Sequence, residues 1–309
     1  MFWAEAVCIF VDDWVGRYEG KRLGQAPRVK DRQPALSQRV DDEGKDESIR
    51  GRWQLADRSA GEPRQRHHAS IVITPILVQA GYRVIAPDQR GFGRSEAPAG
   101  VEHYKIKDIA QDAVAILDRL EVKKAKLVGH DWGASIGWWL AGNYADRFDC
   151  YAALSVGHPK AFASGGFQQK LKSWYMLVFQ IRGFAEAVLR AGNWWIFRKY
   201  LNNHPELERH WIPDLSRPGR LTVALNWYRA NFEQFSKFEF PNAKIPVMGV
   251  WSSRDVALAE TQMVKSAAYV DSLFRYERIE DVGHWMMLDA PDVVGRLLID
   301  CFGRKGSPT

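Results

Sequence analysis

Short runs of β-branched residues alternate with amphipathic helical segments along the chain from about residue 71. This alternation is typical of βαβ units, and it predicts an α/β fold with a mostly parallel sheet flanked by helices. We expect strands at residues 83–86, 125–128, 150–156, 246–250 and 274–279, with a further short strand-like run at residues 71–73.

Helices are predicted between these strands. The apolar residues from Ile109 to Leu120 recur at helical spacing and form one apolar face. A second helix is expected to begin near Gly133, directly after a strand. Between residues 159 and 240 the strand signal disappears and aromatic-rich helical sequence takes its place, which predicts an all-helical insertion.

Residues 16–66 have a different character. They are dense in charged residues, Gln and Pro, and their few apolar residues repeat at neither a helical nor a strand period. We therefore expect a largely irregular or disordered segment, with a solvated patch at residues 41–47. The expected organisation is an atypical charged segment at 1–70, an α/β core at 71–158 and 241–309, and a helical lid at 159–240.

Composition and charge narrow the function classes. With 309 residues, 46% hydrophobic and 26% charged, the chain can bury a large core as a globular protein. The cysteines Cys8, Cys150 and Cys301 are far apart with no metal-type spacing, which favours a reducing compartment over a disulfide framework or zinc site. The net charge of +6 comes from basic residues interspersed with acidic ones, so we expect no nucleic-acid partner.

The pattern of apolar residues also bears on location. No uninterrupted apolar run reaches the roughly 18 residues that a membrane span needs. Residues 1–14 are apolar but carry acidic side chains and have no basic leader, which makes them a poor secretory signal. A cytoplasmic location is therefore expected.

The sharpest local motif is VGHDWGA at residues 128–134, at a strand-to-helix junction. It has the pattern of a nucleophile elbow, in which Gly129 and Gly133 permit a tight turn that lifts the side chain between them above the strand ends. That side chain is Asp131 where a serine hydrolase has Ser, so esterase chemistry is disfavoured. A carboxylate attacks carbon instead and forms an alkyl-enzyme ester. The alternative is that Asp131 only caps the following helix.

An ester on Asp131 requires a general base to activate the water that removes it. His284 follows the last expected strand, and Asp255 follows the strand before it. The chain order Asp131, Asp255, His284 is the nucleophile, acid and histidine order of α/β-hydrolases. We expect His284 to be the base and Asp255 to orient it.

These residues resemble the epoxide hydrolases of the α/β-hydrolase fold, and more loosely the haloalkane dehalogenases. The resemblance extends over about residues 77–302 and rests on GYRVIAPDQRGFGRS at 81–95, GHDWG at 129–133 and DVGHW at 281–285. It is specific for the branch with an Asp nucleophile, and by itself it does not separate epoxides from alkyl halides. In the first motif, Asp88 and Arg90 resemble a supporting loop and receive no catalytic role.

The helical insertion contains the residues that distinguish an epoxide substrate from an alkyl halide. In the epoxide hydrolases, two lid tyrosines protonate the oxygen of the opening epoxide. The resemblance places these roles on Tyr175, in WYMLVFQ at 174–180, and on Tyr228, in LNWYR at 225–229. A dehalogenase needs N–H donors for a leaving halide, and Trp132 could serve there, so haloalkane dehalogenase stays open as the alternative.

The resemblance implies three further site residues. The backbone N–H of Trp132 is expected to donate to the oxyanion formed during ester hydrolysis, and Phe179 and Trp285 are expected to contribute to substrate binding. No metal and no organic cofactor is needed. The expected partners are a small apolar epoxide and water, and the oligomeric state is left open, a homodimer included.

One family motif is absent. In the family, a strand ending in His-Gly-x-Pro precedes the first motif and supplies the second oxyanion donor, and no such motif precedes Gly81. Two interpretations compete: either residues 1–70 are not native to the fold and core strands are missing, or an unusual N-terminal structure replaces them. Loss of one oxyanion donor predicts reduced hydrolysis. A third hypothesis is that the protein is a catalytically impaired relative that acts as a binding protein.

Overall fold

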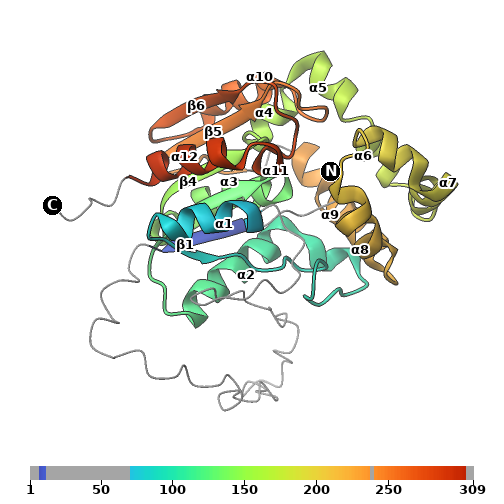
Figure 1. The fold of residues 1–309 in the computed structure, drawn as a ribbon, viewed down its shortest axis with the longest axis horizontal. Coiled ribbons are helices and arrows are strands. Elements are labelled where there is room, and N and C mark those ends of the chain that lie inside the picture. Colours follow the sequence, from blue (N-terminus) through green and yellow to red (C-terminus); the bar gives the residue numbers. More distant parts are fainter. Residues whose placement is uncertain (1–6, 12–69, 237–239, 304–309) are drawn as a thin grey trace, which may run out of the picture.

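The computed structural model describes residues 7–11, 70–236 and 240–303. Its centre is a six-stranded sheet with the order β2-β1-β3-β4-β5-β6 (Figure 1). The strands are β1 (Val7–Val11), β2 (Arg83–Ile85), β3 (Ala125–His130), β4 (Phe148–Leu154), β5 (Val247–Ser252) and β6 (Phe274–Ile279). The pairs from β3 to β6 are all parallel, so the expected mostly parallel sheet is confirmed.

β1 is the strand that the sequence did not predict. It lies between β2 and β3 and runs antiparallel to both, with Ile9 opposite Ile85 on one side and Leu127 on the other. Of residues 1–70, these five and Ser70 are the ones described. The expected irregular segment at residues 16–66 lies outside the described residues.

The prediction of a strand-like run at residues 71–73 is wrong, because these residues belong to helix α1 (Ser70–Gln79). Ile73 and Leu77, one turn apart, are buried. The helix packs so closely on α12 (Pro291–Phe302) that a Cβ at Gly295 would lie 2.7 Å from Cγ2 of Ile76. Burial against α12 therefore outweighs the local preference of β-branched residues for strands.

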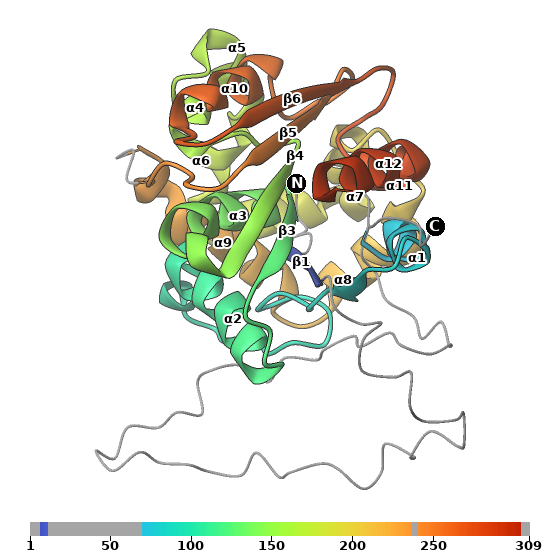
Figure 2. The ribbon, with the colours of Figure 1, turned by 90° about the vertical axis from the view of Figure 1, so that its left-hand side faces the viewer.

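Helices cover both faces of the sheet (Figure 2). α2 (Ile106–Arg119) and α3 (Trp132–Asn143) lie on one side, and α1, α11 (Met286–Asp289) and α12 lie on the other. Because successive strand residues point to opposite faces, Leu127 belongs to the core cluster with α2 and α3, whereas Val128 belongs to the cluster with α1 and α12. β3 is therefore buried on both sides, as parallel strands usually are.

Every element described between β4 and β5 is helical, as the loss of strand signal predicted. We call this segment the helical insertion. It contains α4 (Pro159–Ala163), α5 (Gly166–Lys172), α6 (Tyr175–Phe179), α7 (Phe184–Tyr200), the π-helical turn η6 (Leu207–Trp211), α8 (Ile212–Ser216) and α9 (Arg220–Ser236).

The remaining elements are short. They are the 3₁₀ turns η4 (Val101–Tyr104), η5 (Ala145–Arg147) and η7 (Lys265–Tyr269), together with α10 (Glu260–Val264). Among all the described helices, none combines the length and the apolar character needed to cross a membrane.

Candidate active site

Asp131 occupies the sharp turn between β3 and α3. Its backbone has φ 49° and ψ −117°, a conformation that L-residues rarely adopt. The turn is tight because a Cβ at Gly129 would lie only 2.3 Å from the carbonyl oxygen of Gly133. This is the geometry of a nucleophile elbow, and it places the carboxylate at the N-terminus of α3, where backbone N–H groups and the helix dipole favour negative charge.

The three residues that the sequence singled out for ester chemistry lie together. Nδ1 of His284 is 2.8 Å from Oδ2 of Asp255, and Nε2 of His284 is 3.7 Å from Oδ1 of Asp131. An Nδ1–H that donates to Asp255 leaves the lone pair of Nε2 facing Asp131. Among the described residues, Nε2 of His284 and Oδ2 of Asp131 have no hydrogen-bond partner, although both atoms are buried.

Asp255 is held as a carboxylate. Burial alone would raise the pKa of Asp255, but the neighbouring charge of His284 and its hydrogen bond lower it, and so do the backbone N–H groups of Ala257 and Leu258. These N–H groups donate to Oδ1 over 2.8 Å and 2.9 Å. The net pKa of Asp255 is therefore lowered, and the side chain stays charged beside the imidazole.

The backbone of His284 is fixed by two residues that the sequence did not suggest. Nε2 of His130 donates to the carbonyl oxygen of His284 across 2.8 Å, and Oγ of Ser155 donates to the same oxygen across 3.2 Å. The rings of His130 and His284 also lie 4.7 Å apart. His130 directly precedes Asp131, so one stretch of β3 positions both the carboxylate and the histidine.

Two tyrosines of the helical insertion face Asp131 from the other side. Tyr175 begins α6 and Tyr228 lies on α9, and both are buried, with ring centroids 6.1 Å apart in an edge-to-face arrangement. Burial raises the pKa of both hydroxyls, and the charge of Asp131 raises each further. Both phenols are therefore neutral donors at ordinary pH.

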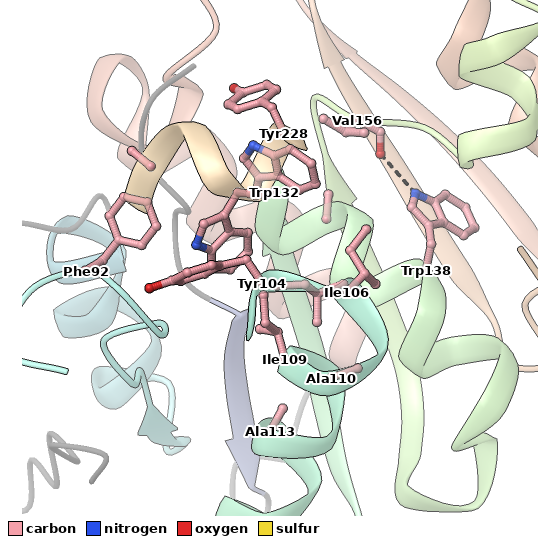
Figure 3. Packing of buried hydrophobic residues seen from close by; sticks show 14 of the residues in the cluster. Phe92, Tyr104, Ile106, Ile109, Ala110, Ala113, Trp132, Trp138, Val156 and Tyr228 are labelled. Atoms are coloured by element: carbon pink, nitrogen blue, oxygen red, sulfur yellow. Dashed lines mark hydrogen bonds between the residues drawn. The ribbon is translucent and has the colours of Figure 1, made fainter. Parts of the chain in front are cut away.

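Trp132 joins the elbow to this tyrosine pair. Its ring meets that of Tyr228 edge to face, with centroids 5.0 Å apart (Figure 3). A hydrogen bond from the Trp132 side chain acts to lower the pKa of Tyr228, in opposition to burial and to Asp131. The indole N–H is the one polar donor on that side chain, so it is this group that donates to the Tyr228 hydroxyl.

Asp131 and the tyrosines line one cavity of about 40 Å³. Its described lining consists of Asp131, Trp132, Ser135, Val156, Phe162, Tyr175, Met176, Tyr228 and Leu258. The sequence analysis did not single out five of these residues, namely Ser135, Val156, Phe162, Met176 and Leu258. Only Ser135 carried a usable signal, because it follows Asp131 by four residues on a predicted helix and so shares its side of that helix.

Phe179 and Trp285 lie outside the described lining of this cavity. Phe179 packs on both tyrosines, with its ring 5.2 Å from that of Tyr175 and 5.0 Å from that of Tyr228. Trp285 instead packs on Trp211, with centroids 4.7 Å apart. Phe179 therefore supports the tyrosine pair, whereas Trp285 forms part of the contact between the core and the helical insertion.

The helical insertion is tied to the loop that carries Asp255. Nζ of Lys172 donates to the carbonyl oxygen of Asp255 across 2.5 Å. Gln169 accepts a hydrogen bond from the N–H of Ala259 and donates one to the carbonyl oxygen of Ala257. Because these contacts join α5 to the loop after β5, the position of the tyrosines is linked to that of the acid.

A second group of contacts holds α6 against α9. Arg229, next to Tyr228, donates to the carbonyl oxygen of Phe179 across 2.8 Å and forms an ion pair with Glu186 at 2.9 Å. Burial would raise the pKa of Glu186, but the hydrogen bond from Arg229 and other N–H donors lower it overall. Arg229 is therefore a positioning residue for both tyrosines.

The described residues contain no group of three or more His, Cys, Asp or Glu side chains arranged to hold a metal ion. The polar groups of the site are the carboxylates of Asp131 and Asp255, the imidazole of His284 and the phenols of Tyr175 and Tyr228. Each of these groups has a stated partner or faces the cavity.

Comparison with known proteins identifies the class. A family model described as the alpha/beta hydrolase fold matches residues 66–291. The chain therefore belongs to the α/β-hydrolase family, and the expected fold is confirmed. Residues 1–65, which include β1, lie outside that match.

The relatives include epoxide hydrolases, as the resemblance predicted. The chain is 30% identical over 238 residues to the AB hydrolase superfamily protein YfhM of Bacillus subtilis, covering 72% of this chain and 82% of that protein. It is 29% identical over 270 residues to epoxide hydrolase A of Mycobacterium tuberculosis, covering 73% and 83%. It is 30% identical over 234 residues to human epoxide hydrolase 4, covering 70% of this chain and 64% of that protein.

Solved structures agree on the fold. Epoxide hydrolase VrEH1 from Vigna radiata superimposes with a TM-score of 0.67 at 23% identity, covering 81% of this chain and 94% of that one. Epoxide hydrolase A from Mycobacterium thermoresistibile gives a TM-score of 0.64 at 24% identity, covering 81% and 93%. At these identities the likeness supports the fold alone.

Proposed function

We propose that this protein is an epoxide hydrolase that converts a small apolar epoxide to a vicinal diol through an alkyl ester on Asp131. The observation that carries the proposal is the single cavity lined by the carboxylate of Asp131 and by Tyr175 and Tyr228. A nucleophile on one side and two neutral acids on the other are what the opening of an epoxide requires.

In the first half-reaction, a carboxylate oxygen of Asp131 attacks the less hindered carbon of the epoxide. A C–O bond to the enzyme forms as the ring C–O bond breaks, and the electron pair moves to the ring oxygen. Tyr175 and Tyr228 hydrogen-bond this oxygen, and one of them supplies its proton. The raised pKa values of both hydroxyls support this role, because each phenol is protonated when the substrate arrives.

In the second half-reaction, water attacks the carbonyl carbon of the ester. Nε2 of His284 accepts a proton from that water, and Asp255 orients the imidazole and stabilises its positive charge. The tetrahedral intermediate then collapses to the carboxylic acid of Asp131 and the alkoxide of the diol. The proton of that acid and the proton on His284 pass to the alkoxide and to the phenolate left by the first half-reaction, so the carboxylate, the imidazole and both phenols are restored. The 3.7 Å separation between Nε2 of His284 and Oδ1 of Asp131 supports attack at this ester.

The oxyanion of that intermediate needs hydrogen-bond donors. The backbone N–H of Trp132, at the start of α3, is the first. The family's second donor belongs to the absent His-Gly-x-Pro motif, and loss of one donor typically slows such a step about a hundred- to a thousand-fold. We therefore propose that hydrolysis of the ester, rather than its formation, limits turnover.

The cavity has room for only a few water molecules, since each needs roughly 10–15 Å³ of such space and the volume is about 40 Å³. Tyr175 and Met176 of α6 form part of its wall. Binding of an epoxide therefore requires the cavity to widen.

The test uses intact-mass spectrometry of a His284→Gln variant incubated with styrene oxide. We expect a mass increase equal to the epoxide, located on the peptide that contains Asp131, because the ester forms and is not hydrolysed. An Asp131→Asn, His284→Gln double variant is the control and should stay unlabelled. A folded His284→Gln protein that gains no mass would overturn the proposal.

Haloalkane dehalogenase is the second candidate, since Asp131 could also displace a halide. Release of bromide from a bromoalkane, faster than diol formation from the epoxide, would favour it. The hydrogen bond from the Trp132 side chain to Tyr228 supports the epoxide hydrolase hypothesis, because an indole N–H that already donates to a hydroxyl is a poor donor to a halide. Tight binding of an apolar ligand with neither turnover nor labelling would favour the binding-protein reading.

A further inference from the structure

The outer side of the helical insertion carries an unusual number of exposed apolar side chains. Eight of the 13 large apolar side chains that are exposed among the described residues lie between Phe167 and Ile196, on α5, α6 and α7 or in the turns between them. We call six of them the outer apolar stripe: Phe167, Leu171, Trp174, Leu177, Ile181 and Phe184. Each is more than half exposed, from 53% for Ile181 to 77% for Phe167.

These six residues follow one another at intervals of three or four along three short helices and the turns that join them. Phe167 and Leu171 lie on α5, Leu177 on α6 and Phe184 on α7. Trp174 and Gln180, which flank α6, also have right-handed helical angles. Trp174 and Leu177, three residues apart, therefore lie on the same side of this helix. The opposite side carries the buried residues, among them Tyr175 and Phe179. α6 is therefore apolar on both its inner and its outer sides, unlike an ordinary surface helix.

The charges around the stripe are almost all positive. Residues 166–200 contain six Lys or Arg residues and one acidic residue, Glu186. Glu186 is occupied by its ion pair with Arg229. Lys170, Arg182 and Arg190 are exposed and form no ion pair within the described part of the chain. The surface thus combines large apolar side chains with uncompensated cations.

We propose that the outer apolar stripe and its surrounding cations form a docking surface for an anionic lipid bilayer. Apolar side chains that include Trp, Phe and Leu, bordered by Lys and Arg, are what an interfacial helix inserts into the boundary between headgroups and acyl chains. The positive charge complements the negative surface potential of anionic lipids.

A second copy of the chain fits this surface less well. In a two-fold dimer the same patch meets itself, so the unpaired cations of the two copies would face each other. Like charges brought together across an interface are unfavourable, whereas anionic headgroups neutralise them. Charge complementarity therefore favours an anionic lipid bilayer over a second copy of the chain as the binding partner of this surface.

The arrangement places the bilayer beside the cavity. Trp174 and Leu177 lie on the outer side of the same short segment whose inner side carries Tyr175 and Met176, which line the cavity. In Figure 1, α6 and α7 lie at one end of the molecule, beyond the sheet, whereas α5 lies next to α10. An apolar substrate dissolved in the lipid would then reach the cavity past α6.

The test is co-sedimentation of the full chain with vesicles of phosphatidylcholine and phosphatidylglycerol, compared with vesicles of phosphatidylcholine alone. We expect binding to the anionic vesicles that weakens as salt is raised, since the screening length falls from about 10 Å at 0.1 M to about 3 Å at 1 M. A triple variant, Trp174→Ser, Leu177→Ser and Ile181→Ser, should bind at least about tenfold more weakly, because three large side chains no longer enter the lipid. Leu273→Ser removes an even more exposed apolar side chain elsewhere and should leave binding unchanged.

The charges are tested separately. Lys170→Gln with Arg182→Gln should weaken binding to the anionic vesicles about tenfold or more, from a contribution of about 1 kcal/mol for each cation near the surface. Arg296→Gln, on the far helix α12, is the matched control. Because no substrate is present, the outcome does not depend on the proposed reaction.

Three results would overturn the proposal. The first is an absence of binding to anionic vesicles, or equal binding to neutral ones. The second is binding that neither set of variants reduces. The third is a dimer in size-exclusion chromatography that the triple variant dissociates while vesicle binding is absent, which would show that the surface joins two copies of the chain.

Discussion

The imidazole of His158 connects the two ends of the helical insertion. Its Nδ1 accepts a hydrogen bond from the N–H of Lys160 at the start of α4, and its Nε2 donates to the carbonyl oxygen of Pro241, beyond the end of α9, across 3.0 Å. The ring is fully buried and stacks on Tyr269 with centroids 4.8 Å apart. The contact with Lys160 requires the neutral imidazole, because Nδ1 acts as an acceptor there.

This contact predicts acid sensitivity. Burial lowers the pKa of His158 to about 4, although the hydrogen bond to Pro241 opposes the shift. Below pH 6.5 the unfolded chain binds a proton at this residue while the folded protein does not, so stability falls as pH drops from about 6.5 towards 4. We expect this residue to account for a loss of about 2 kcal/mol between pH 7 and pH 5.

Urea unfolding at pH 7 and pH 5 measures this loss. A His158→Gln variant should be less stable at pH 7 but should lose less stability on acidification than the wild type. His103→Gln, which changes a partly exposed histidine, serves as the control. An unchanged pH dependence in His158→Gln would contradict the assignment.

The tyrosine pair predicts a defect confined to ester formation. With Tyr175→Phe and Tyr228→Phe combined, we expect the rate of labelling of Asp131 by epoxide to fall about 10²- to 10⁴-fold, the usual contribution of general acid catalysis. Each single variant should lose less, because the other phenol still donates. Stopped-flow or quenched labelling would measure the rate, and Tyr276→Phe, which removes a hydroxyl bonded to Glu260, is the control. Retention of the full rate in the double variant would exclude the two phenols as the acids.

The pair formed by Arg229 and Glu186 predicts a combined loss of stability and activity. Its side chains are only 4% and 14% exposed, and Arg229→Gln would leave Glu186 without its partner. We expect the free energy of unfolding to fall by about 1–3 kcal/mol. The labelling rate should also fall, because α6 is no longer held against α9, and Arg229→Lys should restore part of both. A variant with full labelling at reduced stability would restrict Arg229 to a structural role.

Gly129→Ala tests the elbow itself. The added Cβ would meet backbone atoms of Gly133 and Ala134 at 2.3 Å and 2.7 Å, and backbone cannot move aside as a flexible side chain can. Overpacking of this kind costs about 1–3 kcal/mol, and the resulting shift should displace Asp131 and lower its labelling by epoxide. Gly100→Ala meets only the side chain of Glu102 and should change neither thermal unfolding nor labelling.

The sequence predicted the elements whose signals are local. Five strands are where the β-branched runs placed them, with ends shifted by one or two residues. Asp131, Asp255 and His284 were found because each follows a strand, and the carboxyl ends of parallel strands meet at one edge of a sheet. Their meeting in space needed no knowledge of distant contacts.

The remaining features depend on contacts that no local pattern encodes. β1 is a strand because its backbone pairs with β2 and β3, and the sequence between them gives no indication of its partner. α1 is a helix despite its β-branched residues because α12 offers an apolar surface with a glycine at the point of contact. For the same reason, the stacking of Trp285 on Trp211 could not be deduced from either motif.

The place of β1 in the sheet also sets an order of events during synthesis. β1 leaves the ribosome before either of its neighbours, yet it is the only described strand that connects β2 to the rest of the sheet. It can pair with β2 once residue 85 has been made, but its other edge has no partner until β3 has been made, while the parallel strands that follow can join one another in turn. A nascent chain that stops short of residue 130 would leave one edge of this apolar strand accessible to chaperones. A chain that extends past residue 130 could pair that edge with β3.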